Sequence, residues 1–366
     1  MKTVTQRERQ VLQCIAEYPM ISHQEMADKL GITRSSVAVH ISNLMKKGYI
    51  AGKEYVLRKG NYVVVIGGVN MDIGGISTAP LVCADSNPGK VTMSPGGVGR
   101  NIAHNLCLLG SDVRLLTAFG EDLYGRQAAA SCSELGIDLS HALWASDAST
   151  STYLYVAGPD GDMALAVSDM EICKKITPSY LARNLSLINN AQVVVVDTNL
   201  PEESLLYLAE HCEVPLFCDP VSTRKGKKLL PVLSRIHTLK PNRLEAEILS
   251  GVPIRSEADL DEAVDVLLTK GVKRLFISLG ADGVLAVDSS SRIRLSNLPG
   301  SIVSTTGCGD AFMAALVWAW MEGMNLRTTA LAGLAASAIT MESPLTINPA
   351  LSADRLKIRI NINSRK

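Results

Sequence analysis

The sequence predicts an α/β protein: a doubly wound, mostly parallel sheet with a small β-sheet lid, preceded by a small separate domain. Three observations lead to this fold class. From residue 62 onward, β-branched runs alternate with amphipathic segments, as in parallel strands with helices on both faces. Two stretches, at about 74–94 and 150–168, break that alternation, and the first sixty residues follow a different pattern.

Composition fits a globular protein with one large and one small domain. The 366 residues are 47% hydrophobic and 20% charged, which is ordinary for a folded chain of this length. The formal net charge is zero, but residues 1–60 hold ten Lys and Arg against five Asp and Glu. A basic N-terminal segment on an otherwise acidic chain indicates contact with nucleic acid.

The first domain, residues 1–58, is predicted to contain three helices and a hairpin. Thr5 with Glu8, Ser22 and Thr33 stand where helix caps are expected. The third helix is expected to carry four apolar residues: Val37, Val39, Ile41 and Leu44. Residues 48–50 and 55–57 suggest a short two-stranded wing.

This order of elements resembles the winged-helix domains of bacterial transcription regulators. The resemblance implies that the third helix is the recognition helix and that DNA is a partner. The DNA-facing residues would then be Arg34, Ser35, Ser36, His40 and Asn43. The alternative is a three-helix appendage that only mediates self-association.

The second domain, residues 62–366, carries the alternating pattern. Its expected strands are Val63–Ile66, Val113–Ala118, Val193–Asp197, Leu216–Asp219, Thr238–Lys240 and Leu275–Ser278. Its clearest helical segments are Ile102–Leu109, Leu181–Ile188 and Leu260–Leu268. In the lid, Thr152–Val156 and Met163–Val167 read as a hairpin that turns at residues 158–161.

Cysteine spacing and the N-terminus predict a reduced, cytoplasmic protein. The eight cysteines are scattered, without metal-ligand spacing or a Cys-x-x-Cys motif. The first residues lack the apolar core of a signal peptide. The most apolar stretch, Ala311–Trp320, is too short to span a bilayer, so no membrane partner is expected.

Two glycine motifs suggest a site for a small polar ligand. Gly67–Asp72 follows the first strand at its carboxyl end, where ligands bind in open α/β sheets. Asp72 there is suited to bind sugar hydroxyls, although Asn and Asp are also common turn formers. In Ser94–Asn101, Ile102 stands where a dinucleotide fingerprint needs its third glycine, which argues against a Rossmann cofactor.

Asn242 and Glu245 support two interpretations. They are three residues apart at the start of a predicted helix, so they lie on one face of its first turn. Taken alone, they are best explained as a capping box. A carboxylate at this place is also suited to hold Mg²⁺ through water beside phosphates.

The segment Thr305–Phe312 gives the strongest indication of chemistry. Two glycines at a helix start allow an anion to approach backbone N–H groups closely. Asp310 beside such an anion hole is suited to take a proton from a hydroxyl that attacks a phosphoryl group. The plain alternative is an ordinary helix start with a favourable charge. The chain has no P-loop motif, so nucleotide binding must be of another type.

In order and spacing, these motifs resemble the ribokinase-like (PfkB) family of carbohydrate and nucleoside kinases, over roughly residues 62–345. The resemblance implies transfer of the ATP γ-phosphate to a sugar hydroxymethyl group, with ATP and Mg²⁺ as cofactors. It makes Asp310 the base, and it places Glu245 near Mg²⁺ through water. The anion hole would be Thr306, Gly307, Cys308 and Gly309. The implied ATP-binding residues are Lys240, Asn242, Ser278 and Gly280, and the implied substrate-binding residues are Asn70, Asp72, Gly96, Gly97, Asn101 and Asp169.

Within that family, the sequence is most similar to the pseudouridine kinases. The similar segments are Ala84–Lys90, Pro95–Ala103, Ser168–Met170, Asp219–Ser222 and Ile236–Glu247. The resemblance implies phosphorylation of the 5′-hydroxyl of pseudouridine. Inosine, uridine or ribose remain alternative acceptors, and a ligand-sensing transcription regulator is the alternative from another class.

Two departures from the family pattern bear on cofactors and partners. Ser304 stands where many members carry an aspartate that binds a monovalent cation, so a requirement for K⁺ is left open. The N-terminal head is not part of the usual kinase. The resemblance also implies a homodimer that forms through the lid sheets.

Overall fold

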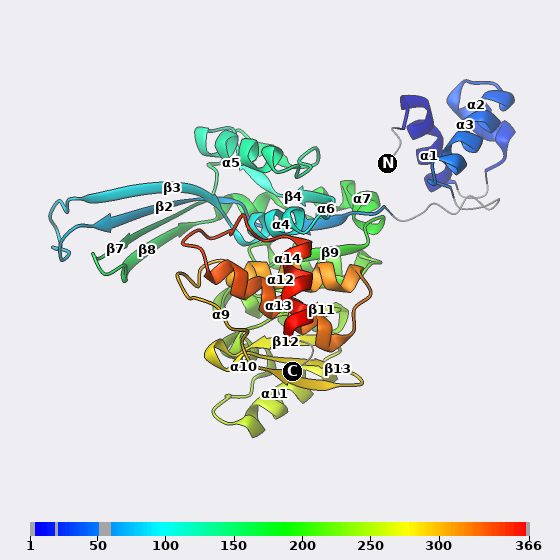
Figure 1. The fold of residues 1–366 in the computed structure, drawn as a ribbon. Helices are drawn as coiled ribbons and strands as arrows, with labels where there is room; N and C mark the ends of the chain where they lie inside the picture. Colours follow the sequence, from blue (N-terminus) through cyan, green and yellow to red (C-terminus); the bar gives the residue numbers. More distant parts are fainter. Residues whose placement is uncertain (1–3, 19–20, 51–59, 364–366) are drawn as a thin grey trace. The chain divides into compact units, whose positions relative to one another are not determined.

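The computed structural model describes residues 4–18, 21–50 and 60–363, and it divides the chain into two units. Residues 1–60 form the head, and residues 61–366 form the body (Figure 1). Each unit has its own hydrophobic core, so each is described by itself.

The head contains three helices: α1 (Gln6–Glu17), α2 (His23–Leu30) and α3 (Arg34–Lys46). Thr5, Ser22 and Thr33 accept hydrogen bonds from the first turns of these helices, as expected. The buried Glu8 side chain binds the Lys47 ammonium at 2.7 Å and so ties α1 to the end of α3.

The four apolar residues of the third helix do not share one face: Val39 is 58% exposed. Val37 and Ile41 are buried, and a residue two positions away from each of them lies on the other side of a helix. The wing cannot be compared in full, because residues 51–59 of the expected hairpin lie outside the described residues.

The body is built on an eight-stranded, mostly parallel sheet, which confirms the predicted fold class (Figure 1). Its order is β14-β13-β12-β11-β10-β9-β1-β4, and only the pairings that involve β13 and β14 are antiparallel. The strands are β1 (Val63–Ile66), β4 (Val113–Leu116), β9 (Val193–Asp197), β10 (Leu216–Asp219), β11 (Thr238–Leu239), β12 (Arg274–Ser278), β13 (Val284–Asp288) and β14 (Arg292–Leu295). β1, β9 and β10 are buried along their whole length, as expected for central parallel strands.

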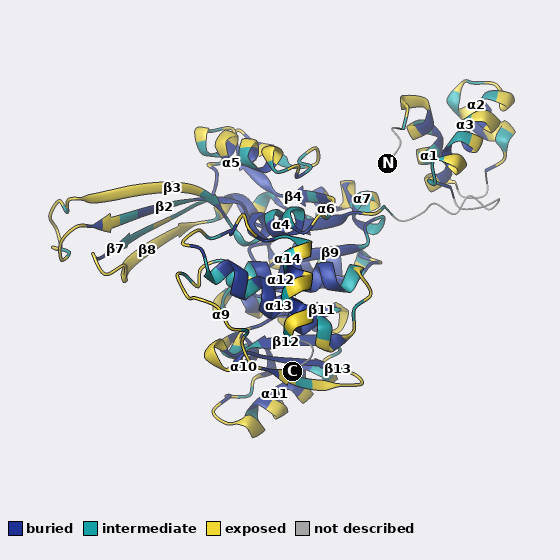
Figure 2. Ribbon diagram, in the orientation of Figure 1, coloured by how far each residue is buried: buried dark blue, intermediate teal, exposed yellow. Residues whose placement is uncertain are grey.

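Two apolar layers cover the two faces of this sheet (Figure 2). One layer contains α4 (Val98–Leu108), α5 (Leu123–Glu134), α12 (Cys308–Met321), α13 (Leu326–Met341) and α14 (Ala353–Asn363). The other contains α6 (Pro178–Arg183), α7 (Leu185–Asn189), α8 (Glu202–His211), α10 (Arg243–Ser250) and α11 (Glu257–Thr269). The remaining elements are α9 (Thr223–Gly226), short 3₁₀ helices at 171–175, 227–235 and 280–282, and the pair β5 (Ala118–Gly120) and β6 (Leu143–Ala145).

Four further strands form the lid, which projects from the body (Figure 1). They are β2 (Asn70–Ser77), β3 (Gly89–Gly96), β7 (Thr152–Ala157) and β8 (Met163–Asp169), in the order β3-β2-β7-β8. The expected hairpin of the lid is present as β7 and β8. The first lid segment is longer than predicted, because β2 begins at Asn70, directly after the turn that ends β1.

The register of the lid gives its two faces different chemistry. Asp72 pairs with Ser94 and with Tyr153, which in turn pairs with Ser168, so these polar side chains share one face. The other face carries the apolar residues Ile73, Val91, Met93, Leu154, Val156, Leu165 and Val167. β3 and β8 are largely exposed (Figure 2).

Two chain-wide expectations concern cysteines and membranes. All eight cysteines lie within the described residues, where they are present as thiols rather than disulfides. Across the described part of the chain, every helix is too short or too polar to cross a bilayer.

Candidate active site

The predicted functional residues meet at the carboxyl edge of the central sheet. β12, β11, β10, β9 and β1 are consecutive neighbours, so the residues that end these strands or directly follow them lie side by side. These residues are Ser278, Lys240, Asp219, Asp197 and the Gly67–Gly68 pair. The Asp197 carboxylate accepts hydrogen bonds from the Gly68 and Asn199 amides, each at 2.8 Å, and so joins two adjacent strand ends.

Helix α12 places the expected anion hole at this edge. The helix begins at Cys308, three residues before the predicted apolar helix, and Gly307 caps it with φ +81°. A side chain at residue 307 would also collide with the Thr346 carbonyl, so the position requires glycine. Among the described residues, no side chain caps this helix. The amides of its first turn are therefore available to an anion.

Asp310 stands in that first turn as a carboxylate with an unusual environment. Its Oδ2 atom accepts a hydrogen bond from Asn101 Nδ2 at 2.9 Å. Desolvation and the nearby Asp219 charge raise the pKa of Asp310 to about 7, although Asn101 and Lys240 act in the opposite direction. A carboxylate with a pKa near neutrality is suited to accept a proton and to release it again.

A buried arginine orients the partner of Asp310. Arg100 Nη1 donates to Asn101 Oδ1 at 3.4 Å, and Nη2 donates to Ser131 Oγ at 3.0 Å. With its oxygen facing Arg100, the Asn101 amide presents its nitrogen to Asp310. Arg100 is only 5% exposed, so its positive charge acts in a poorly solvated environment.

Asp72 is a second carboxylate, on the lid face that looks toward the site. Asn70 Nδ2 donates to Asp72 Oδ1 at 2.6 Å. Desolvation raises the pKa of Asp72, while Asn70 and the Arg100 charge partly oppose that rise. A Cβ atom at Gly96 would collide with the Asp72 carboxylate, so this glycine lets β3 pass close to the acid.

A cavity of about 270 Å³ brings together Asp310 and four of the six predicted substrate-binding residues; Gly96, which lies against the Asp72 carboxylate, is not among its lining residues. It is lined by Asn70, Asp72, Gly97, Val98, Asn101, Tyr153, Ser168, Met170, Asn199, Val221, Lys225, Thr306, Gly307, Asp310 and Thr346. The structure does not bring Asp169 into this cavity. Asp169 pairs with Thr152 on the other face of the lid, and its carboxylate accepts the Glu171 amide at 3.2 Å.

A second cavity, of about 450 Å³, holds the four residues expected to bind ATP. Its walls are Lys240, Asn242, Ser278, Gly280, Ala281, Gly283, Asn297, Ile302, Thr305, Cys308, Gly309, Phe312, Leu334, Ser337 and Met341. Its apolar lining residues include Phe312 of α12 and Leu334 and Met341 of α13. Thr306 and Gly307 face the first cavity while Cys308 and Gly309 face the second, so the start of α12 separates the two.

Lys240 supplies a buried positive charge beside that boundary. Its Nζ atom lies 3.1 Å from Asp219 Oδ2 and 3.5 Å from the position of a Cβ atom at Gly309. Desolvation lowers the pKa of Lys240, but the Asp219, Glu245 and Asp310 charges outweigh it and leave the pKa raised. Lys240 therefore stays protonated near the helix start.

Asn242 and Glu245 form the capping box of α10. Asn242 Oδ1 accepts the Glu245 amide at 2.9 Å, and Glu245 Oε2 accepts the Asn242 amide at 2.9 Å. Desolvation raises the pKa of Glu245 despite that backbone hydrogen bond. The described residues contain no group of three acidic, His or Cys side chains that would hold a metal ion. A divalent ion here would depend on phosphate oxygens and water for most of its ligands.

The sequence analysis missed several residues of the first cavity: Tyr153, Asn199, Val221, Lys225 and Thr346. Asn199 and Val221 come two residues after the ends of β9 and β10, so their positions at strand ends were a signal. Tyr153 shares the lid face of Asp72, which only the register reveals. Thr346 lies in the loop after α13 and carries no pattern of its own.

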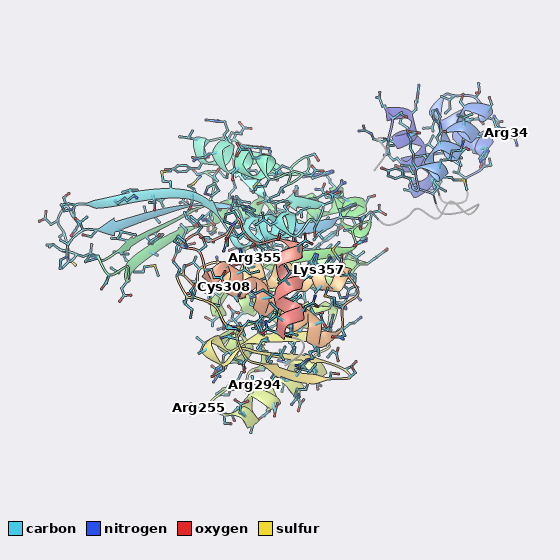
Figure 3. The ribbon with its side chains drawn as sticks, in the orientation of Figure 1. Arg34, Arg255, Arg294, Cys308, Arg355 and Lys357 are labelled. Carbon is cyan, nitrogen blue, oxygen red and sulfur yellow. The ribbon has the colours of Figure 1, made fainter. Side chains whose placement is uncertain are left out.

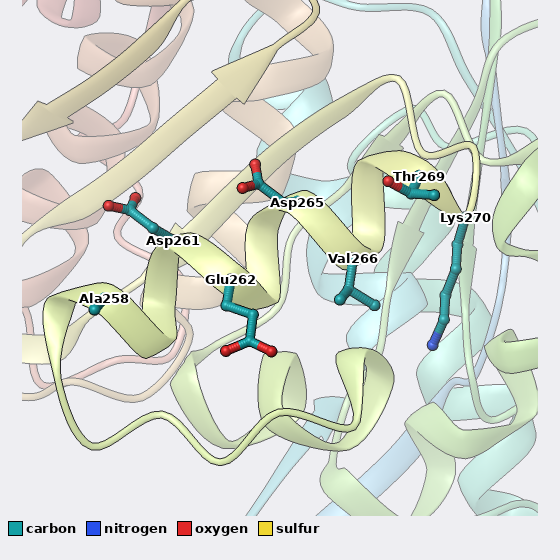
Figure 4. Close-up of a pocket in the computed structure, with 7 residues that line it drawn as sticks. All are labelled: Ala258, Asp261, Glu262, Asp265, Val266, Thr269 and Lys270. Carbon is teal, nitrogen blue, oxygen red and sulfur yellow. The ribbon is translucent and has the colours of Figure 1, made fainter.

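A third hollow, of about 650 Å³, lies on the surface of α11 (Figure 4). Asp261 and Asp265 border it, and each forms an ion pair with Arg292 at 2.6 Å. None of the predicted functional residues lines this hollow. Its acidic side chains are explained by these surface ion pairs.

The residues expected to face DNA lie together in the head. Arg34 and Ser35 are exposed, and Ser36 and His40 are half-buried in the same helix, α3. The Arg34 side chain extends from the start of that helix (Figure 3). The Ser35 and Ser36 hydroxyls lie 3.0 and 2.8 Å from the hydroxyl of Thr33.

Family models match both units of the chain. A model of the pfkB family of carbohydrate kinases matches residues 61–353. A model of winged helix-turn-helix DNA-binding domains matches residues 5–51. These matches agree with the two resemblances that the motifs indicated.

Curated relatives and solved structures are similar over most of this chain. The uncharacterized sugar kinase YeiI of Escherichia coli K12 is 41% identical over 95% of this chain and 97% of its own length. The pseudouridine kinase of the same organism is 40% identical over 81% of this chain and 95% of its own length. A carbohydrate kinase from Agrobacterium tumefaciens superposes with a TM-score of 0.73 at 29% identity, covering 82% of this chain and 97% of that structure.

Proposed function

Because this chain belongs to the pfkB family of carbohydrate kinases, we propose that it phosphorylates the 5′-hydroxyl of pseudouridine with ATP and Mg²⁺. The observation that carries the proposal is the position of Asp310. Asp310 lines the smaller cavity, and the start of its helix separates that cavity from a larger one that holds the residues expected to bind ATP. The 40% identity to a pseudouridine kinase supports the choice of acceptor.

The residues of the site suggest how the transfer proceeds. Asp310 accepts the proton of the 5′-hydroxyl as that oxygen attacks the γ-phosphorus of ATP. The bond from the γ-phosphorus to its bridging oxygen breaks, and ADP leaves with that oxygen. The amides of residues 307–309 donate to the phosphoryl oxygens, where preorganised donors stabilise the developing charge. Lys240 adds a positive charge beside them.

Mg²⁺ is the cofactor that the family and the acidic surroundings imply. Bound to the phosphates, the ion neutralises negative charge that would otherwise repel the attacking oxygen. Glu245 is the carboxylate that would hold its water ligands, because only one of its two oxygens is used by the Asn242 amide.

A panel of acceptors tests the choice of substrate. Purified protein would be given ATP, Mg²⁺ and, in separate reactions, pseudouridine, uridine, inosine or ribose, with ADP release as the readout. We expect the highest kcat/KM for pseudouridine. A higher kcat/KM for ribose or inosine would assign the protein to another acceptor, and no turnover with any of them would favour a ligand-sensing role.

We further propose that the head binds DNA, so that the kinase also regulates transcription. The observation in favour is the match of residues 5–51 to DNA-binding winged helices, together with the exposed start of α3. In a mobility-shift assay with DNA from upstream of its own gene, replacement of Arg34 and His40 by Ala should abolish the shift.

The DNA assay needs a control for charge and a control for salt. Arg255→Ala removes one positive charge from an exposed position in the body (Figure 3) and should retain the shift. Binding should weaken steeply with salt, since phosphate contacts release counterions. A shift that is absent or insensitive to salt in the wild type would make the head a self-association device.

A further inference from the structure

We propose that Lys225 selects the acceptor by binding an oxygen on its base, so that the site favours nucleosides with oxo groups. This inference rests on the proposed function, because it assumes that the smaller cavity holds a nucleoside. Three observations support it: a strained turn, a half-buried lysine without an acidic partner among the described residues, and the presence of both carboxylates and hydrogen-bond donors in the cavity.

The strained turn lies directly after β10. Val221 has a φ of +61°, a conformation that is rare and strained for a β-branched residue. The Asp219 carboxylate accepts the Val221 amide at 2.9 Å, and Pro220 O accepts the Ser222 amide at 2.6 Å. Thr198 Oγ1 also donates to Pro220 O, at 2.5 Å. These contacts hold a turn that the sequence disfavours, which indicates a use for its shape.

That turn delivers Lys225 to the wall of the cavity. Ser222 Oγ accepts the Lys225 amide at 3.3 Å and so starts α9. The Lys225 ammonium donates to Asn199 Oδ1 at 2.6 Å, and both side chains line the cavity. Within the described part of the chain, the ammonium forms no ion pair and this is its one hydrogen bond. An ammonium group has three donors, so two remain for a ligand.

The cavity offers both acceptors and donors of hydrogen bonds. Asp310 and Asp72 are carboxylates, which accept hydrogen bonds from sugar hydroxyls. Lys225 offers only donors, and the Ser168 hydroxyl of the lid also can donate. A ligand that satisfies both the carboxylates and the donors has hydroxyls on one part and acceptor oxygens on another. A ribonucleoside with a dioxopyrimidine base has this arrangement, whereas cytidine replaces one oxo group with an amino donor.

The test compares Lys225→Met with the wild type on pseudouridine, uridine, cytidine and ribose. Loss of a hydrogen bond from a charged group should lower kcat/KM about 10–100-fold for pseudouridine and uridine, mainly through KM. Cytidine and ribose should lose much less, so that the preference for dioxopyrimidine nucleosides falls. Lys227→Met, at the exposed neighbouring position, is the matched control and should retain both rates and preference.

Two outcomes would overturn the inference: an equal loss of kcat/KM on ribose and on pseudouridine, or no loss on any acceptor. An equal loss on ribose and on pseudouridine would indicate that Lys225 binds the sugar and not the base. Lys225→Arg keeps a charged donor and should retain most of the preference, which keeps the inference testable if the methionine variant folds poorly. The wild-type arm tests the proposed function separately, because a wild type that phosphorylates no nucleoside refutes that proposal before any variant is compared.

Discussion

Asp310 shows how one residue acquires the properties of a base from its surroundings. It lies at a helix start, which favours a negative charge, but it is also poorly solvated and close to Asp219. The unfavourable effects prevail, and the pKa of the carboxyl rises to about 7. Asn101 limits that rise with one hydrogen bond. The same surroundings therefore govern both reactivity and stability.

The first prediction concerns the pH dependence of activity. The base works only when it is ionised, so kcat/KM should increase with pH and level off above a pKa of about 7. In Asn101→Ala the Asp310 carboxylate loses a hydrogen bond that favours its charged form. The rise of kcat/KM should therefore move to higher pH. A profile of kcat/KM between pH 5 and 9 gives both values. A rise of kcat/KM centred near pH 4 in the wild type would contradict this description of Asp310.

The second prediction concerns stability. The pKa of Asp310 is higher in the folded protein than the ordinary value of 3.8. Its protonated form therefore favours the folded state below pH 4, and that contribution is lost as pH rises through about 7. Asp310→Asn cannot ionise. Its free energy of unfolding should exceed that of the wild type by an amount that grows by about 2 kcal/mol from pH 4 to pH 8, allowing for water in the cavity.

Urea unfolding of both proteins at several pH values measures this difference. The side chain introduced by Asp310→Asn keeps an oxygen that can accept from the Asn101 amide, so the packing changes little. A difference in unfolding free energy that stays constant from pH 4 to pH 8 would show that Asp310 titrates normally.

At the scale of elements, the lid sheet has an apolar face without a described partner. Val91, Leu165 and Val167 are 69%, 55% and 61% exposed on that face, and an apolar patch of this kind usually marks an interface. We propose that two lids pair in a homodimer, as the family resemblance implies.

The third prediction follows from that pairing. A charge on the apolar lid face should dissociate the dimer, because the charge would have to be buried without a partner. Light scattering should report a dimer for the wild type and a monomer for Leu165→Glu with Val167→Glu. Leu123→Glu, at a 67% exposed position of α5, is the control and should stay dimeric. A monomeric wild type would overturn the pairing.

The strands were predicted from the sequence more completely than the face of the lid on which each side chain lies. β-branched runs located the parallel strands, because a strand that is buried on both faces has to be apolar throughout. The placement of Asp169 requires the register of β8, and the pairing of β7 with β8 shifts at Val156. A shift of one residue moves a side chain to the other face, and no local pattern reveals it.

The missed cavity residues have a physical explanation as well. Asn199 and Lys225 follow strands that were predicted, but a valine at positive φ in the turn after β10 contradicts local propensity. Hydrogen bonds of Asp219 and Thr198, the second formed across the fold, hold that turn. Motifs of consecutive residues, such as Thr305–Phe312, were recognisable because their function depends on the local backbone.

At the scale of the whole molecule, the head and the body are two separate compact units. Val11, Met26 and Leu44 belong to a core of the head, and the two cores of the body contain no residue of the head. Every residue of the two site cavities belongs to the body. The residues of the proposed kinase site therefore all come from the body.

The fourth prediction is that removal of residues 1–60 leaves the kinase intact. The truncated protein should retain kcat and KM within about 2-fold of the full chain, since each domain has its own core. It should at the same time lose DNA binding. Steady-state kinetics give kcat and KM for the truncated protein and the full chain. A large loss of kcat in the truncated protein would mean that the head contributes to the active site.

The most direct test of the central claim is product formation by the wild type and by Asp310→Asn. With γ-labelled ATP, Mg²⁺ and pseudouridine, the wild type should produce labelled pseudouridine 5′-phosphate. The variant should form it about 10²–10⁴-fold more slowly, as expected for loss of a general base, while its affinity for an ATP analogue remains near that of the wild type. Wild-type rates in Asp310→Asn would contradict the mechanism, and a label on any other acceptor or hydroxyl would contradict the proposed substrate.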